Sequence, residues 1–239
     1  MNTLSHRSLV PEILDGLAAD DPRARASRRD LRRINALMFQ APIMASLLRK
    51  FVPTPQRRIL EIGAGDGTFM LAVARRIARH RPAVELTLLD RTGLVTAALA
   101  ADFGRLGWKI ETITCDVFDW AERPDGKHFD AITVNLFLHH FHDAQLVHLF
   151  SLLMPKAPLL LATEPLRAMP ALAATRLLPV LGANDVTRHD AAQSVRAGFR
   201  GSELSALWLA ANGKPLEERR AGLFSHIFVG ASTKAGGNP

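Results

Sequence analysis

The sequence predicts an α/β protein with a doubly wound sheet of seven strands, mostly parallel and ending in an antiparallel hairpin. Three observations predict this fold. Short apolar runs alternate with stretches of helical length, a glycine-rich turn follows the first run, and only two residues separate the last two runs. Strands that alternate with helices favour a parallel sheet, because each parallel connection needs a long crossover.

Five apolar runs are expected to form the parallel strands: Ile59–Gly63, Val84–Leu89, Ile110–Thr114, Ala131–Asn135 and Leu159–Thr163. Crossover helices are expected over Gly67–His80, Gly93–Leu106 and Asp143–Leu153. A further helix, from about Gly201 to Asn212, precedes two strands, Leu216–Arg220 and Leu223–Ala231. The short gap between these two strands predicts an antiparallel hairpin.

The region before the first strand is expected to be helical. Asp21 followed by Pro22 is typical of a helix start. Apolar or small residues then recur at spacings of three and four: Ala24, Ser27, Leu31, Ile34 and Met38. Six arginines occupy the other faces of this helix: Arg23, Arg25, Arg28, Arg29, Arg32 and Arg33. A second helix should run from about Pro42 to Phe51. We therefore divide the chain into an N-terminal helical lid (1–56) and a catalytic domain (57–235) with an insert at about 164–200.

Composition limits the class of protein. The chain has 239 residues, of which 48% are hydrophobic, so one sizeable core is expected. No apolar run approaches the roughly 20 residues that a membrane span needs, and no signal peptide is apparent, so we expect a cytoplasmic protein. The single cysteine, Cys115, excludes an internal disulfide and lacks the partners of a zinc site. We predict no metal site.

The charge is distributed unevenly. Residues 1–58 hold eleven Lys and Arg against five Asp and Glu, and the rest of the chain holds nineteen against eighteen, so most of the net charge of +7 lies at the N-terminus. The predicted catalytic domain is therefore close to neutral, and we expect no nucleic-acid partner. A helix rich in arginine is more often a solvated face or a lid than a grip on phosphates.

The strongest signal is the segment Arg57–Arg76, which holds RILEIGAGDGTFMLAVARR, an apolar strand followed by a glycine-rich turn and a helix. Gly63 and Gly65 let the backbone turn sharply and approach a ligand at the carboxyl edge of the sheet. A dinucleotide-binding loop is the competing interpretation, but position 68 is Thr where that pattern has its third glycine.

Two acidic residues argue against a dinucleotide-binding loop. Glu61 and Asp66 would repel a pyrophosphate at the start of the helix. S-adenosylmethionine (SAM) has no phosphate and carries a sulfonium and an ammonium group, so carboxylates beside its methionine portion are favourable. The loop therefore predicts a SAM site.

Two later positions support this prediction. Asp90 ends the second strand, where it can accept hydrogen bonds from ribose hydroxyls. Asp116 follows the third strand and can accept from an adenine amino group, while Val117 covers the ring; a solvated loop Asp is the alternative for Asp116. With the E-x-G-x-G-x-G loop, these positions resemble class I SAM-dependent methyltransferases over about Arg57–Thr163.

That resemblance implies a Rossmann-like seven-stranded sheet whose last two strands form the antiparallel hairpin. It also implies SAM as cofactor and S-adenosylhomocysteine (SAH) as product. The cofactor-binding residues that we expect are Glu61, Gly63, Ala64, Gly65, Gly67, Asp90, Arg91, Asp116, Val117 and Asn135.

The acceptor is predicted to be a small molecule. The segment Asn135–Phe141, NLFLHHF, resembles the branch of the family that includes quinone and phenol methyltransferases. The Asn/Asp-Pro-Pro-aromatic tetrapeptide of amino-methylating enzymes is not found here. Cys115 lacks the Pro-Cys context of cytosine C5 methylation and is expected to be a small buried hydrophobe.

Methyl transfer is an in-line displacement, so holding the acceptor in line and excluding water can supply up to about 7–11 kcal/mol. A general base still helps a phenol, which is mostly neutral at pH 7, and histidine suits that role. His139, His140, His142 and His189 are candidates, of which we favour His140 and His189 as the base. For each of these histidines, the alternative is a side chain that bonds to local backbone or faces solvent, and this is at least as common as a catalytic role.

The insert is expected to cover the active site. This stretch, with EPLR (Glu164–Arg167) before it and AGLFSHIFVG (Ala221–Gly230) at the end, resembles bacterial methyltransferases, some of them associated with type III polyketide pathways. The resemblance implies a phenolic or pyrone hydroxyl as acceptor. Four residues of the insert would face it: Arg188 as a catalytic cation, His189 as base, and Asp190 and Arg196, with His139, as substrate-binding residues. A structural Arg–Asp network that pins the insert to the sheet is the alternative.

Two rival functions remain open at this stage. One is an RNA methyltransferase that uses the basic N-terminal helix. The low aromatic content argues against it, because bases stack on aromatic side chains, and these make up only 6% of the chain and include no tyrosine. The other is a SAM-binding protein without turnover. The sequence also leaves open whether oxygen, carbon or nitrogen is methylated and whether the chain forms a homodimer.

Overall fold

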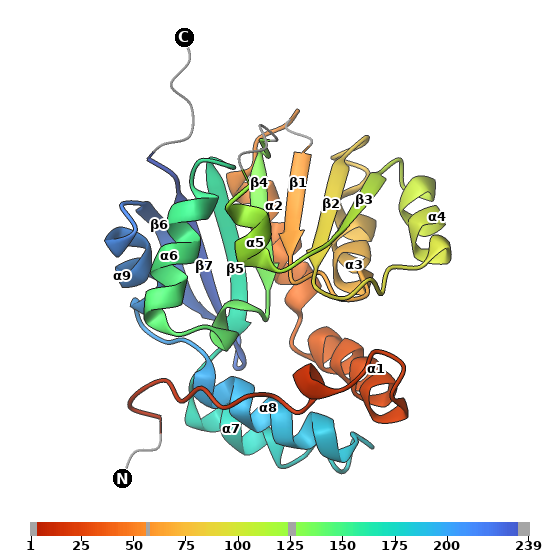
Figure 1. The fold of residues 1–239 in the computed structure, drawn as a ribbon, viewed down its shortest axis with the longest axis vertical. Coiled ribbons are helices and arrows are strands. Elements are labelled where there is room, and N and C mark those ends of the chain that lie inside the picture. Colours follow the sequence, from red (N-terminus) through yellow and green to blue (C-terminus); the bar gives the residue numbers. More distant parts are fainter. Residues whose placement is uncertain (1–3, 56–57, 124–127, 234–239) are drawn as a thin grey trace.

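Seven strands form one sheet in the order β3-β2-β1-β4-β5-β7-β6 (Figure 1). The computed structural model describes residues 4–55, 58–123 and 128–233. The strands are β1 (Arg58–Ile62), β2 (Glu85–Asp90), β3 (Lys109–Thr114), β4 (Ala131–Asn135), β5 (Leu159–Pro165), β6 (Lys214–Ala221) and β7 (Ser225–Ala231). The first five are parallel, and β7 is antiparallel to both β5 and β6. The predicted fold class is confirmed.

Helices cover both faces of the sheet. One face packs against α2 (Gln40–Phe51), α3 (Thr68–Ile77) and α4 (Ala97–Arg105), with Met44, Val73 and Phe103 in its apolar core. The other packs against α5 (Val117–Ala121), α6 (Asp143–Leu153) and α9 (Glu203–Ala210), with Trp120 and Trp208 in its core. Because both faces are covered, β1, β4 and β5 are buried almost throughout, which explains their continuous apolar sequences.

A third group of helices lies beyond the carboxyl ends of the parallel strands, at the bottom of Figure 1. It consists of α1 (Pro22–Leu37), α7 (Met169–Thr175) and α8 (Asp185–Ala197). Hydrogen bonds join α1 to α8: Thr187 Oγ1 donates to Ser27 Oγ at 2.9 Å, and Asn184 N to Asp30 Oδ2 at 2.9 Å. The insert between β5 and β6 is thus fastened to the N-terminal helix.

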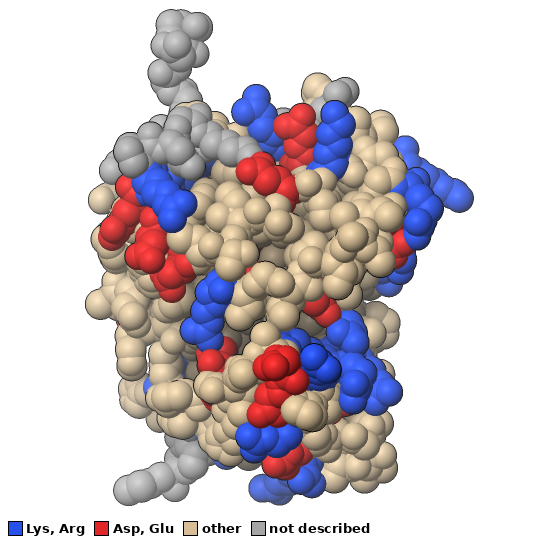
Figure 2. Space-filling model, turned by 45° about the vertical axis from the view of Figure 1, so that its right-hand side comes forward, with Lys and Arg blue, Asp and Glu red and all other residues tan. Residues whose placement is uncertain are grey.

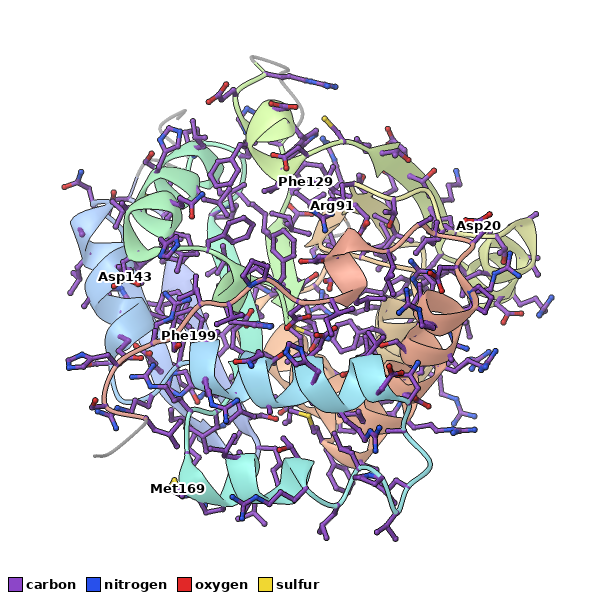
Figure 3. All side chains as sticks on the ribbon, turned by 60° about the horizontal axis from the view of Figure 1, so that its bottom comes forward. Asp20, Arg91, Phe129, Asp143, Met169 and Phe199 are labelled. Atoms are coloured by element: carbon purple, nitrogen blue, oxygen red, sulfur yellow. The ribbon has the colours of Figure 1, made fainter. Side chains whose placement is uncertain are left out.

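The N-terminal segment, residues 4–17, crosses this same edge and ends in a short 3-10 helix, η1 (Leu14–Gly16). Ser8 N donates to the Arg196 carbonyl at 3.1 Å, and Asp190 accepts from Ile13 N and Leu14 N at 2.9 and 3.0 Å. Figure 3 shows the segment running between α8 and the strand ends. The cover of the sheet edge therefore has two layers from distant parts of the chain.

The expected element boundaries differ from the structure in a few places. The helix expected from Gly93 begins at Ala97, because Thr96 caps it by accepting from Leu99 N at 3.2 Å. The proposed domain limits at residues 56, 57 and 235 lie outside the described residues. Within the described ranges, no helix is both long and apolar enough to cross a membrane.

Candidate active site

A cavity of about 480 Å³ lies at the carboxyl edge of the sheet, a size typical of ligand sites. It is lined by the residues that follow β1, β2, β3 and β4, and by the N-terminal segment and α1. The strand order reverses at β1, which has β2 on one side and β4 on the other. In doubly wound sheets, ligands bind outside the strand ends at this point.

The loop after β1 brings the backbone into the cavity. Gly63, Gly65 and Gly67 have φ values of 71°, 55° and 77°, in the region that favours glycine. A Cβ at Gly63 would lie 2.5 Å from Phe137, and one at Gly67 would lie 2.7 Å from Leu99. A Cβ at Gly65 would meet nothing within 4 Å, so its missing side chain leaves space on the cavity side. Gly63, Ala64 and Gly65 line the cavity, whereas Gly67 caps α3 behind it.

Asp90 ties the loop after β1 to the end of β2. Its Oδ2 accepts from Gly65 N at 2.8 Å, and its Oδ1 accepts from Thr92 N at 2.8 Å. The next residue, Arg91, also lines the cavity and donates to Asp15 of the N-terminal segment at 2.8 Å, beside η1 in Figure 3. The carboxylate of Asp90 is therefore fixed at the carboxyl end of β2, on the cavity wall.

The loop after β3 forms another wall of the cavity. Asp116 caps α5 by accepting from Phe118 N at 2.8 Å, and Val117 is buried beside it. Cys115 also lines the cavity and is only partly buried. It was expected to be a small buried hydrophobe; it packs against the apolar core only in part, and its sulfur accepts from Arg123 Nη2 at 3.1 Å, because β3 is an edge strand.

Two polar residues lie at the floor of the cavity. Glu61 is fully buried and accepts a hydrogen bond from Thr133 Oγ1. Burial raises the pKa of Glu61 to about 8, because this hydrogen bond only partly offsets the loss of water. Its carboxyl is therefore mostly protonated at pH 7, and the negative charge expected of Glu61 is absent. Asn135 Oδ1 accepts from Thr163 Oγ1 at 2.7 Å.

His139 is held between two carboxylates. Its Nδ1 donates to Glu164 Oε2 at 2.7 Å, and its Nε2 lies 3.6 Å from Glu12 Oε1. Glu164 also accepts from Phe137 N and Leu138 N at 3.0 and 2.8 Å, which fixes it at the end of β5. Burial alone would lower the pKa of His139, but hydrogen bonds and charge from the two glutamates outweigh it and raise the pKa to about 9.

The pKa of the neighbouring His140 is shifted in the opposite direction. Its ring centroid lies 4.3 Å from that of His139, and its Nδ1 lies 3.6 Å from Asp15 Oδ2. Burial and the positive charge of His139 lower the pKa of His140, although Glu12, Asp15 and Glu164 oppose the shift. The two neighbouring rings, both on the cavity wall, are therefore a cation and a neutral base at neutral pH.

Glu12 and Asp15 were missed in the sequence, because nothing in residues 4–17 predicts a regular element near the site. Burial raises the pKa of Glu12, but hydrogen bonds from His139 and Ser194 and the charge of the histidines lower it to about 2. Glu164 could have been found, since it stands at the carboxyl end of β5, where parallel sheets place their sites.

One group of described side chains could hold a metal ion: the nearest ligand atoms of Glu12, His139 and His140 lie within 4.8 Å of one another. In the structure, Glu12 and His139 pair with each other instead. His139 also pairs with Glu164, so its imidazolium lies between two carboxylates. The prediction that the protein lacks a metal site stays a prediction.

Most of the predicted residues of the insert lie away from the cavity. Arg188, His189 and Arg196 are not among its lining residues, and the His189 side chain is 42% exposed. Asp190 is buried but points to the N-terminal segment, where it accepts the two backbone N–H groups of η1 and its preceding residue. The insert covers the edge of the sheet, but within it only Pro165 and Ser194 reach the cavity.

Comparisons with known proteins agree with this geometry. Residues 59–155 match the family model described as a methyltransferase domain. Comparison with curated protein sequences gives no match.

Among solved structures, the fold is similar to an O-methyltransferase family protein from Burkholderia thailandensis, with 17% identity and a TM-score of 0.60, over 92% of this chain and 64% of that one. An O-methyltransferase family 2 protein from Planctomyces limnophilus, solved with apigenin, has 17% identity and a TM-score of 0.58, over 90% of this chain and 63% of that one. Magnesium protoporphyrin IX methyltransferase from Synechocystis, solved with bound SAH, has 12% identity and a TM-score of 0.54, over 92% of this chain and 91% of that one. The chain thus spans less than two thirds of the first two proteins and most of the third.

Proposed function

We propose, from the premise that residues 59–155 form a class I SAM-dependent methyltransferase domain, that this protein transfers the methyl group of SAM to a hydroxyl oxygen of a small molecule. The observation that carries the proposal is the pair His139–His140 on the wall of a cavity that also contains the glycine-rich loop and Asp90. Cofactor and proton-transfer groups thus face the same space.

In this proposal, the cofactor lies along the strand ends. Asp90 accepts from the ribose hydroxyls, Asp116 and Val117 receive the adenine, and the methionine portion lies against Gly63–Gly65 and above Glu61. Arg91 and Asn135 complete the lining of this part. The sulfonium then approaches the two histidines, where the acceptor binds.

The histidine pair supplies the proton chemistry. Two adjacent groups whose surroundings push their pKa values apart are suited to different roles. Neutral His140 accepts the proton of the acceptor hydroxyl as its oxygen attacks the methyl carbon, and that bond forms as the sulfur–carbon bond breaks to give SAH. Cationic His139, held between Glu12 and Glu164, keeps the neighbouring His140 in its neutral form.

A phenolic acceptor fits these groups best. A phenol with a pKa of about 10 needs a base at neutral pH, and His140 is neutral there. Phe137 and Phe141 line the same part of the cavity and offer aromatic rings to pack against. The Planctomyces protein was solved with apigenin, which is a phenol. Arg28 and Arg32 of α1 also line this cavity.

A methylation assay tests the proposal. The protein is incubated with SAM and a panel of phenols, and SAH and methylated products are measured. We expect His140→Gln to lower kcat by about a hundredfold at pH 7, with partial recovery as the pH rises toward the acceptor's pKa. His80→Gln, an exposed histidine outside the cavity, is the matched control.

The assay also separates the rivals. SAH binding without methylation of any phenol would favour a protein that binds SAM without turnover. Methylation of RNA but not of phenols would overturn the small-molecule assignment. Equal activity of His140→Gln and the parent at every pH would remove His140 as the base.

A further inference from the structure

One face of α1 forms part of the cavity wall. Arg28, Leu31, Arg32 and Asn35 all line the cavity, and their spacings of three and four place them on one side of the helix. The opposite side carries exposed arginines such as Arg33, whose side chain is 70% exposed. Figure 2 shows basic side chains gathered over this part of the molecule.

Asn35 carries a polar atom without a protein partner. Its Oδ1 is buried, and no hydrogen-bond donor reaches it from any described residue. Buried carbonyl oxygens in proteins are nearly always hydrogen-bonded. Because this oxygen belongs to a residue of the cavity wall, a donor on a ligand is the natural partner for it.

Arg32 places this face beside the glycine-rich loop. Its Nη1 donates to Asp66 Oδ2 at 2.7 Å, and Asp66 follows Gly65 in that loop. Asp66 Oδ1 is already taken by Thr68 N and Oγ1, at 3.1 and 2.6 Å. The Arg32 side chain is 43% exposed, so it keeps donors that Asp66 does not use.

The position along the sheet indicates which part of the cofactor comes here. On the proposed function, the ribose lies at Asp90 after β2 and the adenine at Asp116 after β3. The other end of SAM then extends the opposite way, toward β1 and β4. The hydrogen bond from Arg32 to Asp66 places α1 beside the glycine-rich loop, at the end of β1.

We propose that α1 binds the amino-acid end of SAM: Arg32 donates to its carboxylate, and Asn35 Oδ1 accepts from its ammonium group. The inference rests on the proposed function, since it requires SAM in this cavity. It gives the N-terminal region a direct role in cofactor binding. The ligand carries one positive and one negative group, and the wall offers a guanidinium and an amide oxygen that match them.

Two ligands that differ only at this end test the assignment. SAH carries the amino-acid group, whereas 5′-methylthioadenosine has a methyl group in its place. Calorimetric titration with both ligands is carried out on the parent, Arg32→Gln and Asn35→Ala. We expect each substitution to weaken SAH binding about tenfold or more, since a charge-assisted hydrogen bond is lost, and to leave binding of 5′-methylthioadenosine unchanged.

Two further variants complete the test. Arg33→Gln removes a neighbouring arginine on the exposed side and should leave both affinities unchanged. Asn35→Asp keeps an acceptor oxygen and should retain SAH binding. Equal weakening of both ligands, or of neither, in Arg32→Gln and Asn35→Ala would overturn the assignment. Failure of the parent to bind either ligand would instead overturn the proposed function.

Discussion

Glu61 and His139 are both buried, yet at neutral pH Glu61 is uncharged and His139 is positively charged. Among the described residues, only the hydroxyl of Thr133 is shown to act on Glu61, and burial raises the pKa of Glu61 to about 8. His139 faces Glu12 and Glu164, which hold its pKa at about 9 in spite of burial. At neutral pH the floor of the cavity is therefore uncharged and its wall carries a cation.

The state of Glu61 predicts how stability depends on pH. Its pKa is raised above the unfolded value of 4.5, so the unfolded chain ionises first as the pH rises toward 8. Stability is therefore lost across this window, by up to about 1.4 kcal/mol per pH unit. Glu61→Gln should remove that loss, so its melting temperature should fall less between pH 5 and 8 than the parent's.

Thermal melts at pH 5, 6, 7 and 8 measure the effect, with Glu85→Gln at the exposed start of β2 as control. Parallel pH profiles for the parent and Glu61→Gln would contradict an uncharged Glu61.

The cavity-lining residues that could be predicted from sequence are those at the end of a strand or shortly after it. Asp90 and Asp116 were found because the apolar runs before them are easily recognised and parallel strands end at one edge. Asn35 and Glu12 were missed because each reaches the cavity from an element whose position depends on tertiary packing. The histidines were found as a group, but only the contacts of Glu12, Glu164 and Asp15 assign a state to each.

At the scale of elements, the N-terminal segment has a larger part than its sequence suggests. Residues 4–17 contain little regular structure, yet they supply Glu12 to His139 and Asp15 to His140 and Arg91. Arg7 fastens the segment beside them, donating to Asp143 at 2.6 Å and to the Phe141 carbonyl at 2.9 Å. The charge of the histidine pair thus depends on this segment being in place.

Glu12→Gln tests that dependence. Without the carboxylate, the pKa of His139 should fall by about one unit or more, because one of its two counter-charges is gone. The imidazole signals of His139, followed by NMR over pH 5–10, measure the change. Glu85→Gln, at the exposed start of β2, should leave the pKa of His139 in place. An unchanged pKa in Glu12→Gln would show that Glu164 alone sets the charge.

The elements themselves were largely predictable, and the exceptions have physical reasons. All seven strands were expected. Covered strands such as β1, β4 and β5 have continuous apolar runs, whereas β3 and β6 are partly exposed and were expected from their place in the order of elements. The insert was expected to be a cover, but α8 turns Val186, Thr187 and Asp190 inward and leaves Arg188 outward. The buried side of that helix is set by its contacts with α1 and η1, which a local pattern does not contain.

The whole molecule consists of a sheet between two helical layers, closed at one edge by a cover from two distant parts of the chain. The N-terminal segment with α1 and the insert with α8 are bonded to each other and enclose the cavity. A ligand that contacts both the strand ends and α1 should stabilise this cover as a unit.

Hydrogen exchange with and without SAH measures this stabilisation. At a ligand concentration of 100 times Kd, binding adds about 2.7 kcal/mol to global stability. We expect the largest slowing of exchange in residues 8–17, in α1 and in α8, together with the loop after β1. Protection of the loop after β1 alone would contradict a cover that closes on the cofactor, and β6, remote from the cavity, serves as internal reference.

The covering elements also suggest how a protein of this kind can acquire a different acceptor. The glycine-rich loop, Asp90 and the histidine pair all lie within residues 59–155, whereas the N-terminal segment, α1 and α8 lie outside that range. On the proposed function, substitutions in the covering elements that leave Glu12 and Asp15 in place can reshape the acceptor's surroundings and keep the charge of the histidine pair. A new acceptor could therefore be acquired through changes in these elements, with the chemistry inherited intact.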